Sequence, residues 1–211
     1  MKKYVLIGDQ IKKYKKKINV SADKSLSIRW VLMAAQAVGK SIAYNLLNSE
    51  DVNNSLIAVK KLGVKVIKKK NLCQINGVGL NGFSIKNNTV IDAGNSGTLA
   101  RLIIGVLAKS NKTIVLKGDK SLSKRDFSRV IKPLKKFGLS FKSNKNNLPL
   151  KFKGTNYLSP IQYEELKGSA QVKSSILLAA LNTPGKTKVR CFPSRDHTER
   201  LFKFLNLPIK I

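Results

Sequence analysis

The sequence predicts an α/β (α+β) domain made of three consecutive helix-and-strand repeats, and two recurring patterns carry this prediction. The first pattern runs from small polar or glycine residues into an apolar stretch of helical length, then breaks and continues into a strand-like run. The second is an amphipathic stretch that stops at Gly or Asn before another strand-like run. Both patterns occur in the same order three times, which favours a true repeat over a chance likeness of apolar helices.

The first pattern opens repeats at about residues 19–85, 90–155 and 160–211. It reads DKSLSIRWVLMAAQAVGKSIAYNLL, then GNSGTLARLIIGVLAKSNKTIVLKG, then GSAQVKSSILLAALNTPGKTKVRCF. The lysines before the strand-like runs, Lys40, Lys112 and Lys186, recur every roughly 70 residues, which is the scale of a supersecondary unit.

The second pattern closes each repeat and reads AVKKLGVKV, PLKKFGLSF and FKFLNLPIKI. Each predicts a helix, a Gly or Asn at its C-terminal stop, and a strand. The stretch LPLKFKG adds a further strand between repeats. Residues 209–211 are expected to begin a strand, so the third repeat is interpreted as truncated.

Composition limits the class of protein. The chain has 211 residues, of which 42% are hydrophobic, enough for one or two small domains with a core. No apolar run of membrane-spanning length occurs, and the first apolar stretch, YVLIG, is too short for a signal peptide. The two cysteines match no metal spacing. We therefore expect a reduced, cytoplasmic protein with no membrane partner and no bound metal.

The net charge of +30 comes from 41 Lys and Arg residues against 11 Asp and Glu residues. Such a balance suggests a nucleic acid or another acidic partner. However, the excess is almost all lysine, spread over the whole length, and aromatic residues make up only 7% of the chain. No strip of alternating basic and aromatic residues is present, so nucleic-acid binding is judged unlikely.

The seven arginines are more informative than the lysines, because a guanidinium grips phosphate or carboxylate at two points. Three of them are interpreted as helix-surface ion pairs: Arg129, Arg190 and Arg200. Four lie beside Ser, Thr, Gly or Asp and are candidate anion ligands: Arg29, Arg101, Arg125 and Arg195.

The starts of the first helices predict where an anion would bind. Each begins among Ser, Gly or Asn, so unpaired backbone N–H groups and the positive end of the helix dipole would face outward. Three repeated helices would aim these ends at a common surface. Lys24, Arg29, Arg101 and Ser169 would add side chains there.

Five motifs in order, ADKSLSIR, DAGNSGTLARL, GDKSLSKR, GSAQVKSSILLA and SRDHTE, resemble the EPSP synthase (3-phosphoshikimate 1-carboxyvinyltransferase) family. The resemblance implies two domains, each of three βαβαββ-type repeats around a pseudo-threefold axis. It implies transfer of the enolpyruvyl group of phosphoenolpyruvate to the 5-hydroxyl of shikimate 3-phosphate, without metal or organic cofactor. Both substrates are small anions.

The resemblance also implies roles for individual residues. Lys24 would contact both substrates and act catalytically by moving protons. The other residues implied to bind shikimate 3-phosphate are Ser25, Arg29, Ser169, Ala170, Gln171, Ser194 and His197. The others implied to bind phosphoenolpyruvate are Asn95, Gly97, Thr98, Arg125 and Gln171.

Several of these positions have a plainer interpretation. Asp23 is expected to be a local cap rather than a catalytic acid. Arg101 either binds ligand or braces the glycine turn. His197 would be interpreted as an ordinary exposed histidine without its motif, Lys173 is interpreted as helix surface, and Trp30 as core.

The chain departs from the family pattern. Ser21-Ala22 stands where the family has Pro-Gly, Ile28 replaces a histidine, and Asp126 replaces the proline after Arg125. The family is about twice as long, so the chain resembles the N-terminal half. Residues 1–18 would associate with the missing domain and 19–211 would form the three-repeat domain. The C-terminal half would be a partner in cis or in trans, and the chain alone is expected to be inactive.

Alternative functions remain open at this point. One is the related enolpyruvyl transfer to UDP-N-acetylglucosamine, although that family has Lys-Asn in place of Lys24-Ser25 and uses a loop cysteine near the position of Arg125. A second is a basic RNA-binding module. A third possibility is a split or truncated gene product that another chain completes.

Overall fold

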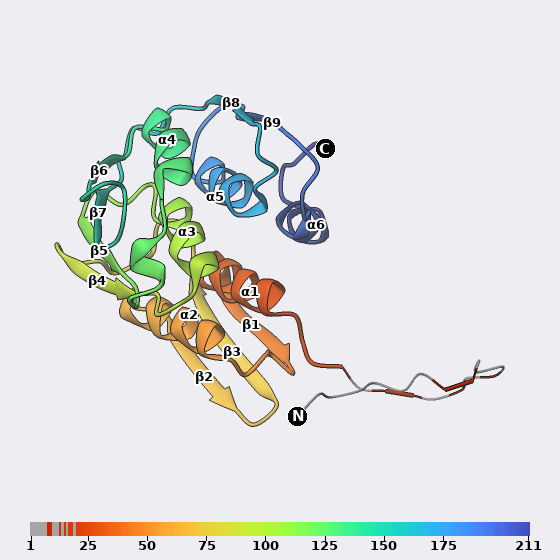
Figure 1. Cartoon of the computed structure of the whole chain (residues 1–211). Coiled ribbons are helices and arrows are strands. Elements are labelled where there is room, and N and C mark those ends of the chain that lie inside the picture. The colour runs from red at the N-terminus through yellow and green to blue at the C-terminus, as the bar shows by residue number, and fades with distance from the viewer. Residues whose placement is uncertain (1–7, 10–12, 14, 16, 19) are drawn as a thin grey trace, which may run out of the picture.

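The computed structural model describes residues 8, 9, 13, 15, 17, 18 and 20–211 (Figure 1). Most of the segment 1–18 therefore lies outside the described residues, and its expected association with a second domain stays a prediction. The elements, in chain order, are α1 (Lys24–Gln36), β1 (Val38–Tyr44), α2 (Glu50–Lys61), β2 (Lys65–Lys69), β3 (Leu72–Val78), β4 (Thr89–Asp92), α3 (Gly97–Val106), β5 (Thr113–Lys117), the 3₁₀ turn η1 (Leu122–Lys124), α4 (Ser128–Lys136), β6 (Ser140–Lys142), β7 (Leu150–Lys153), β8 (Gln162–Glu165), α5 (Ala170–Ala180), β9 (Lys188–Cys191) and α6 (His197–Phe204).

The second repeat shows the unit in full, as β4, α3, β5, α4, β6 and β7. Its four strands form a sheet in the order β4-β5-β7-β6, in which β4 runs parallel to β5 and β7 runs antiparallel to both neighbours. The first repeat has the same order from its helix onward, with a sheet β1-β3-β2. The third has β8 parallel to β9 with α5 between them, followed by α6. The predicted repeat is confirmed.

The residues predicted to stop the second helices do so through their backbone conformation. Gly63 after α2 has φ +85°, Gly138 after α4 has φ +107°, and Asn206 after α6 has φ 53°. A residue with the left-handed backbone conformation ends a helix and turns the chain away from it. Glycine and asparagine adopt this conformation most readily. The prediction for residues 209–211 is wrong, because they form no strand. The backbone N–H of Ile209 instead donates to the carbonyl of Leu207, at 2.8 Å.

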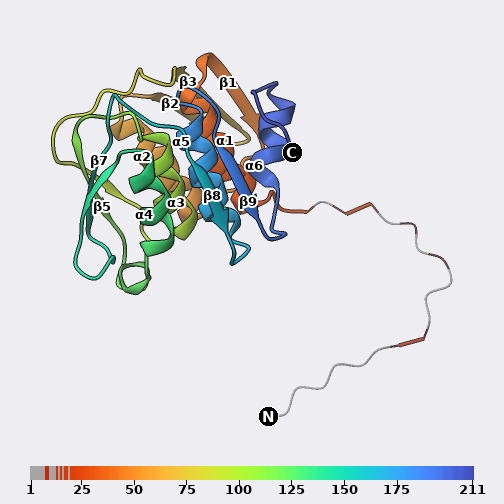
Figure 2. The same cartoon turned by 90° about the horizontal axis from the view of Figure 1, so that it is seen from above.

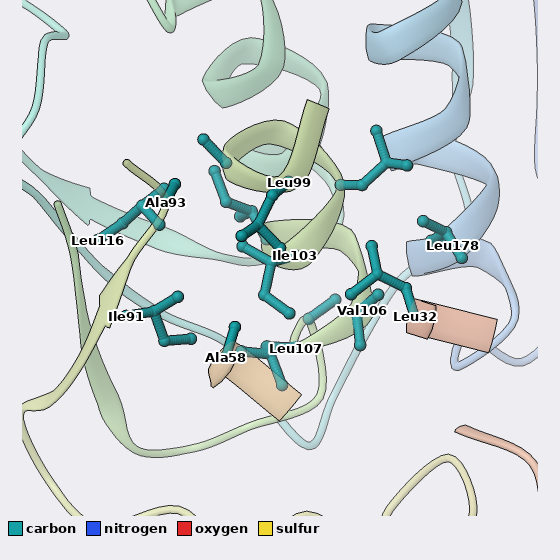
Figure 3. Close-up of a cluster of buried hydrophobic side chains, with 14 of the residues drawn as sticks. Leu32, Ala58, Ile91, Ala93, Leu99, Ile103, Val106, Leu107, Leu116 and Leu178 are labelled. Carbon is teal, nitrogen blue, oxygen red and sulfur yellow. The ribbon is translucent and has the colours of Figure 1, made fainter. Parts of the chain in front are cut away.

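The first helices of the repeats, α1, α3 and α5, lie together in the interior, while α2, α4 and α6 lie farther out (Figures 1 and 2). Apolar side chains from them meet in one core, and Figure 3 shows Leu32 of α1, Ile103 of α3 and Leu178 of α5 in it. Trp30 packs against this core while half-buried. Within the described residues, no helix is both long and apolar enough to cross a membrane.

Helices α3 and α5 approach each other closely at Gly105. A Cβ atom at this position would lie 2.2 Å from the carbonyl oxygen of Ser175, so only glycine fits there. The Ser175 hydroxyl donates to the carbonyl of Arg101 at 2.8 Å, which ties the same residue of α5 to α3 one turn nearer the N-terminal end of α3. This crossing fixes how the N-terminal turns of α3 and α5 face each other.

Candidate functional site

The N-terminal ends of α1, α3 and α5 are capped by the small polar residues that the sequence places there. Asp23 Oδ1 accepts from the N–H of Leu26 at 2.7 Å, which confirms its interpretation as a local cap. Ser96 and Ser169 accept from the N–H groups three residues later, at 3.2 and 3.4 Å. These caps leave the N–H groups of the first helical residues directed outward.

Arg29 links the first turns of α1 and α5 to α6. Its Nη1 donates to the carbonyl of Ser25 at 3.0 Å, its Nη2 to Ser174 Oγ at 2.9 Å, and its Nε to Thr198 Oγ1 at 2.8 Å. The residue is only 4% exposed. Burial, together with the charge of Arg195, lowers the pKa of Arg29 from its ordinary value. Arg29 therefore joins the first and third repeats, and its contact with a ligand stays a prediction.

The glycine turn before α3 brings two guanidinium groups together. A Cβ atom at Gly97 would lie 2.8 Å from Arg101 Nη1 and 3.1 Å from Arg125 Nη1, so the absent side chain leaves room for both. Arg125 Nη2 donates to Asn95 Oδ1 at 3.2 Å, and its side chain is otherwise exposed. Two positive charges on the same side of this turn repel each other, and an anion bound between them would offset the repulsion.

Arg101 is the inner member of this pair. Its Nη1 donates to the carbonyl of Gly97 and to Gln171 Oε1, each at 3.1 Å, and its guanidinium lies 4.9 Å from the centre of the Phe127 ring. Burial and the nearby charges of Arg125 and Arg129 lower its pKa. Of the two roles left open by the sequence, these contacts support a brace for the glycine turn.

Gln171 connects the glycine turn to the third repeat. While its Oε1 accepts from Arg101, its Nε2 donates to Thr98 Oγ1 at 3.0 Å. The structure thus brings together five of the six residues predicted for phosphoenolpyruvate, from the start of α3, the end of η1 and α5: Asn95, Gly97, Thr98, Arg125 and Gln171. We call this group the glycine-turn cluster.

A pocket of about 390 Å³ opens beside this cluster, at the N-terminal end of α5. Its lining consists of residues 167–171, residues 194–195 and Arg129. Four residues predicted for shikimate 3-phosphate are therefore in one place: Ser169, Ala170, Gln171 and Ser194. The Oγ of Ser194 is buried and has no hydrogen-bond partner within the described residues. A helix N-terminus with hydroxyl groups and cations around it can hold a phosphate.

Three cations line this pocket. Arg195 was a candidate anion ligand in the sequence analysis, whereas Arg129 and Lys167 were not. Arg129 is an ion-pair residue as expected, but its partner is the buried Glu165 of another repeat, at 3.4 Å. No local pattern pointed to Arg129, because Arg125 is extended and lies before α4, so helical spacing does not relate the two residues. Lys167 gave no signal, because nothing distinguishes it from the other lysines of the chain.

Glu165 ends β8 and was also missed. Its Oε2 accepts from the backbone N–H of Ser169 at 2.6 Å, and its Oε1 accepts from Arg129 Nη2 at 3.4 Å. The residue is 4% exposed. A buried carboxylate thus lies against two residues of a pocket that is otherwise cationic.

Comparisons with known proteins agree with this geometry. A family model described as EPSP synthase (3-phosphoshikimate 1-carboxyvinyltransferase) matches residues 9–211. The chain belongs to this family. A 3-phosphoshikimate 1-carboxyvinyltransferase of Ruthia magnifica is 44% identical over 92% of this chain and 45% of its own length, and one of Endomicrobium trichonymphae is 41% identical over 92% and 46%.

A solved structure of EPSP synthase from Acinetobacter baumannii superimposes with a TM-score of 0.87 at 37% identity. The match covers 93% of this chain and 45% of that chain. The chain therefore spans about half the length of the EPSP synthase relatives that it matches.

Lys24, the residue that the EPSP synthase resemblance makes catalytic, starts α1. Its Nζ lies 3.1 Å from Asp51 Oδ2 of α2, and 53% of the Lys24 side chain is exposed. An ion pair of this exposure contributes little, about 0–1 kcal/mol, so the ammonium can leave Asp51 for a ligand at small cost. No signal in the sequence pointed to Asp51.

The SRDHTE motif of the EPSP synthase resemblance is held by buried polar contacts. Lys173 is 6% exposed and forms an ion pair with Glu199, so its interpretation as helix surface is wrong. An ammonium on this face of α5 is tolerated because the carboxylate of α6 lies against it. His197 is half-buried, its Nδ1 has no partner within the described residues, and it is not among the residues that line the pocket.

Proposed function

We propose that this chain forms the part of an EPSP synthase that holds the phosphate groups of its two substrates. The whole protein would transfer the enolpyruvyl group of phosphoenolpyruvate to the 5-hydroxyl of shikimate 3-phosphate and release phosphate. The observation that carries the proposal is the convergence of Arg101 and Arg125 on Gly97, next to a cationic pocket at the start of α5. This arrangement suits two anions bound side by side.

Shikimate 3-phosphate would place its phosphate in the pocket. The N-terminal end of α5 offers backbone N–H groups and a positive dipole, and the hydroxyls of Ser169 and Ser194 offer donors. Arg129, Lys167 and Arg195 supply the opposing charge. Ser25, Arg29 and His197 would complete the site around the sugar-like ring and its carboxylate.

Phosphoenolpyruvate would lie against the glycine-turn cluster. Arg125 is exposed, and among the described residues only Asn95 holds its side chain, so its remaining N–H groups are available to phosphate. Arg101 stays behind the turn and adds positive charge without leaving its bonds to Gly97 and Gln171. Since Gln171 also lines the pocket, it would lie between the two substrates.

The chemistry is an addition followed by an elimination. The 5-hydroxyl oxygen attacks C2 of phosphoenolpyruvate, the hydroxyl proton leaves, and a proton joins C3 to make a methyl group. The C2–O bond to phosphate then breaks, and a methyl proton leaves to restore the double bond. Lys24 is proposed to move protons at this centre. Because the chain spans about half the length of its relatives, turnover is proposed to need the remaining half.

The first test is ligand binding by the purified 211-residue chain. Millimolar shikimate 3-phosphate should raise the melting temperature, because a ligand that binds only the folded state stabilises it, whereas shikimate without phosphate should not. Arg195→Gln should weaken binding about tenfold, since it removes a charged donor of the pocket. Arg190→Gln is the matched control, because Arg190 is exposed and pairs with Glu164 at 3.7 Å. Equal effects of the two variants would contradict the proposed site.

The second test is activity. The chain alone should give no 5-enolpyruvylshikimate 3-phosphate from the two substrates, and measurable turnover would refute the need for the missing half. The alternative function suggested by the net charge is RNA binding, and a salt titration of the chain with generic RNA tests it. Tight binding that falls steeply as salt is added would favour an RNA-binding function. We place the activity in the cytoplasm, where the free cysteines Cys73 and Cys191 would stay reduced.

A further inference from the structure

We propose that Glu165, a buried carboxylate beside the pocket, lowers the affinity of the pocket for inorganic phosphate. The inference rests on the proposed function in one respect, namely that the pocket at the start of α5 accepts a phosphate group. It adds a residue that selects between ligands and that the family resemblance did not provide.

The position of Glu165 is the first reason. One carboxylate oxygen accepts a hydrogen bond from the N–H of Ser169, and the other accepts one from Arg129. Two donors that a bound phosphate could use are therefore already bonded to a carboxylate of the protein. The carboxylate is buried, and it is held at the end of β8, where Glu165 pairs with Cys191 of β9. It cannot swing away into solvent as an exposed side chain would.

The charge balance is the second reason. Without Glu165, the pocket would combine Arg129, Lys167 and Arg195 with the positive end of α5. Such a site would bind any phosphate, including the inorganic phosphate that the proposed reaction releases. A fixed negative charge next to the pocket weakens the binding of every anion there. A larger ligand can offset this penalty through contacts of its ring and carboxylate, whereas inorganic phosphate has no other groups.

Glu165 holds its two donors unequally, and Arg129 is the one held more loosely. Its side chain is 44% exposed and lines the pocket, and its single contact with Glu165 is long, at 3.4 Å. The guanidinium is therefore shared between the carboxylate and the pocket rather than locked. Ser169 N–H, at 2.6 Å from the carboxylate, is the donor that stays occupied.

The experiment is a titration of the 211-residue chain with inorganic phosphate, followed by calorimetry or by amide chemical shifts. Glu165→Gln keeps an oxygen for the N–H of Ser169 and removes the charge, and it should tighten phosphate binding by about fivefold to tenfold. Glu164→Gln is the matched control. It makes the same change in the adjacent residue, whose side chain is 59% exposed and pairs with Arg190, and it should change the affinity less than about twofold.

The outcomes separate the two proposals. Unchanged or weaker phosphate binding by Glu165→Gln, in a chain that still binds shikimate 3-phosphate, overturns the role of Glu165 and leaves the proposed function standing. Absence of binding of both ligands, in wild type and variant alike, overturns the proposed function. If Glu165→Gln fails to fold, Glu165→Asp decides, because its shorter carboxylate cannot reach both partners and should tighten phosphate binding by a smaller factor.

Discussion

At the scale of single residues, the site is supported by a network of buried, hydrogen-bonded polar side chains around Arg29. Thr198 is an example, since its Oγ1 accepts from Arg29 Nε and donates to Ser174 Oγ at 2.7 Å. Ser174 in turn donates to the carbonyl of Ala170. One hydroxyl therefore holds α6 against α1 and α5 next to the pocket.

Replacing this hydroxyl should be costly. Thr198→Val keeps the shape of the side chain but leaves the buried guanidinium of Arg29 with one partner fewer. We expect the free energy of unfolding to fall by about 1–3 kcal/mol, measured by urea denaturation. Thr113→Val is the matched control, because Thr113 lies half-buried in a strand and its hydroxyl makes no hydrogen bond within the described residues, while its backbone N–H donates to Asn87. Equal stability of both variants would show that the network around Arg29 contributes nothing.

The scale of the residue is also where sequence reasoning reached its limit. Asn95, Gly97, Thr98, Arg125 and Gln171 were found through their motifs, and the structure brings them together. Glu165 and Arg129 were not, because their pairing joins residues 36 positions apart, on elements whose relative placement no local pattern reveals. Lys173 was misinterpreted for the same reason, since its partner Glu199 lies on another helix.

At the scale of elements, the crossing of α3 and α5 sets the geometry of the site. Gly105→Ala should destabilise the fold although alanine favours helices by about 1 kcal/mol over glycine, because the new Cβ would meet the carbonyl of Ser175 at 2.2 Å. We expect a net loss of about 1–3 kcal/mol in thermal or urea unfolding. Gly8→Ala, whose Cβ would have nothing within 4 Å, is the control and should be neutral. A stabilised Gly105→Ala would mean that the two helices lie farther apart.

The start of α4 provides a prediction about pH. The side chain and backbone N–H of Ser128 donate to Asp126 and lower the pKa of its carboxyl below the ordinary value. A lowered pKa in the folded state gives stability that is present above the unfolded pKa, near 3.9, and is lost as pH falls through the folded pKa.

Asp126→Asn should therefore melt below wild type at pH 7, by an amount worth less than about 1 kcal/mol because the carboxyl is exposed. The difference should vanish at a pH below the folded pKa. Asp196→Asn is the control, since Asp196 caps α6 without a side-chain hydrogen bond. A gap between Asp126→Asn and wild type that persists in acid would assign the effect to something other than the charge. At the position where the family pattern has a proline, Asp126 would therefore make the start of α4 depend on a charge.

The elements themselves were largely predictable. The repeat follows from side-chain periodicity, and the stops at Gly63, Gly138 and Asn206 follow from the backbone conformation that a helix end requires. Residues 209–211 were mispredicted because alternating apolar and polar residues indicate only which side chains would share one face of a strand. A strand also needs a neighbour to accept its hydrogen bonds, and no pattern within three residues reports one.

At the scale of the whole molecule, the charge of +30 acts on stability. Like charges spread over one compact domain repel each other, and salt screens that repulsion. We expect the melting temperature to rise by several degrees between about 50 and 500 mM sodium chloride. The rise should persist in Arg129→Gln, because it comes from the whole surface rather than from chloride in the pocket. A constant or falling melting temperature would show that local ion pairs outweigh the net charge.

The bonds of Arg29 also have a consequence for the synthesis of the protein on the ribosome. Its partner Thr198 is added 169 residues later, which at a translation speed of about 5 to 20 residues per second is a delay of roughly 10 to 30 s. During this time α1 can exist only with its guanidinium in water, so it cannot be packed as it is in the finished domain. The first helix of the described domain is therefore among the last to reach its final packing, and chaperones have this interval in which to bind it.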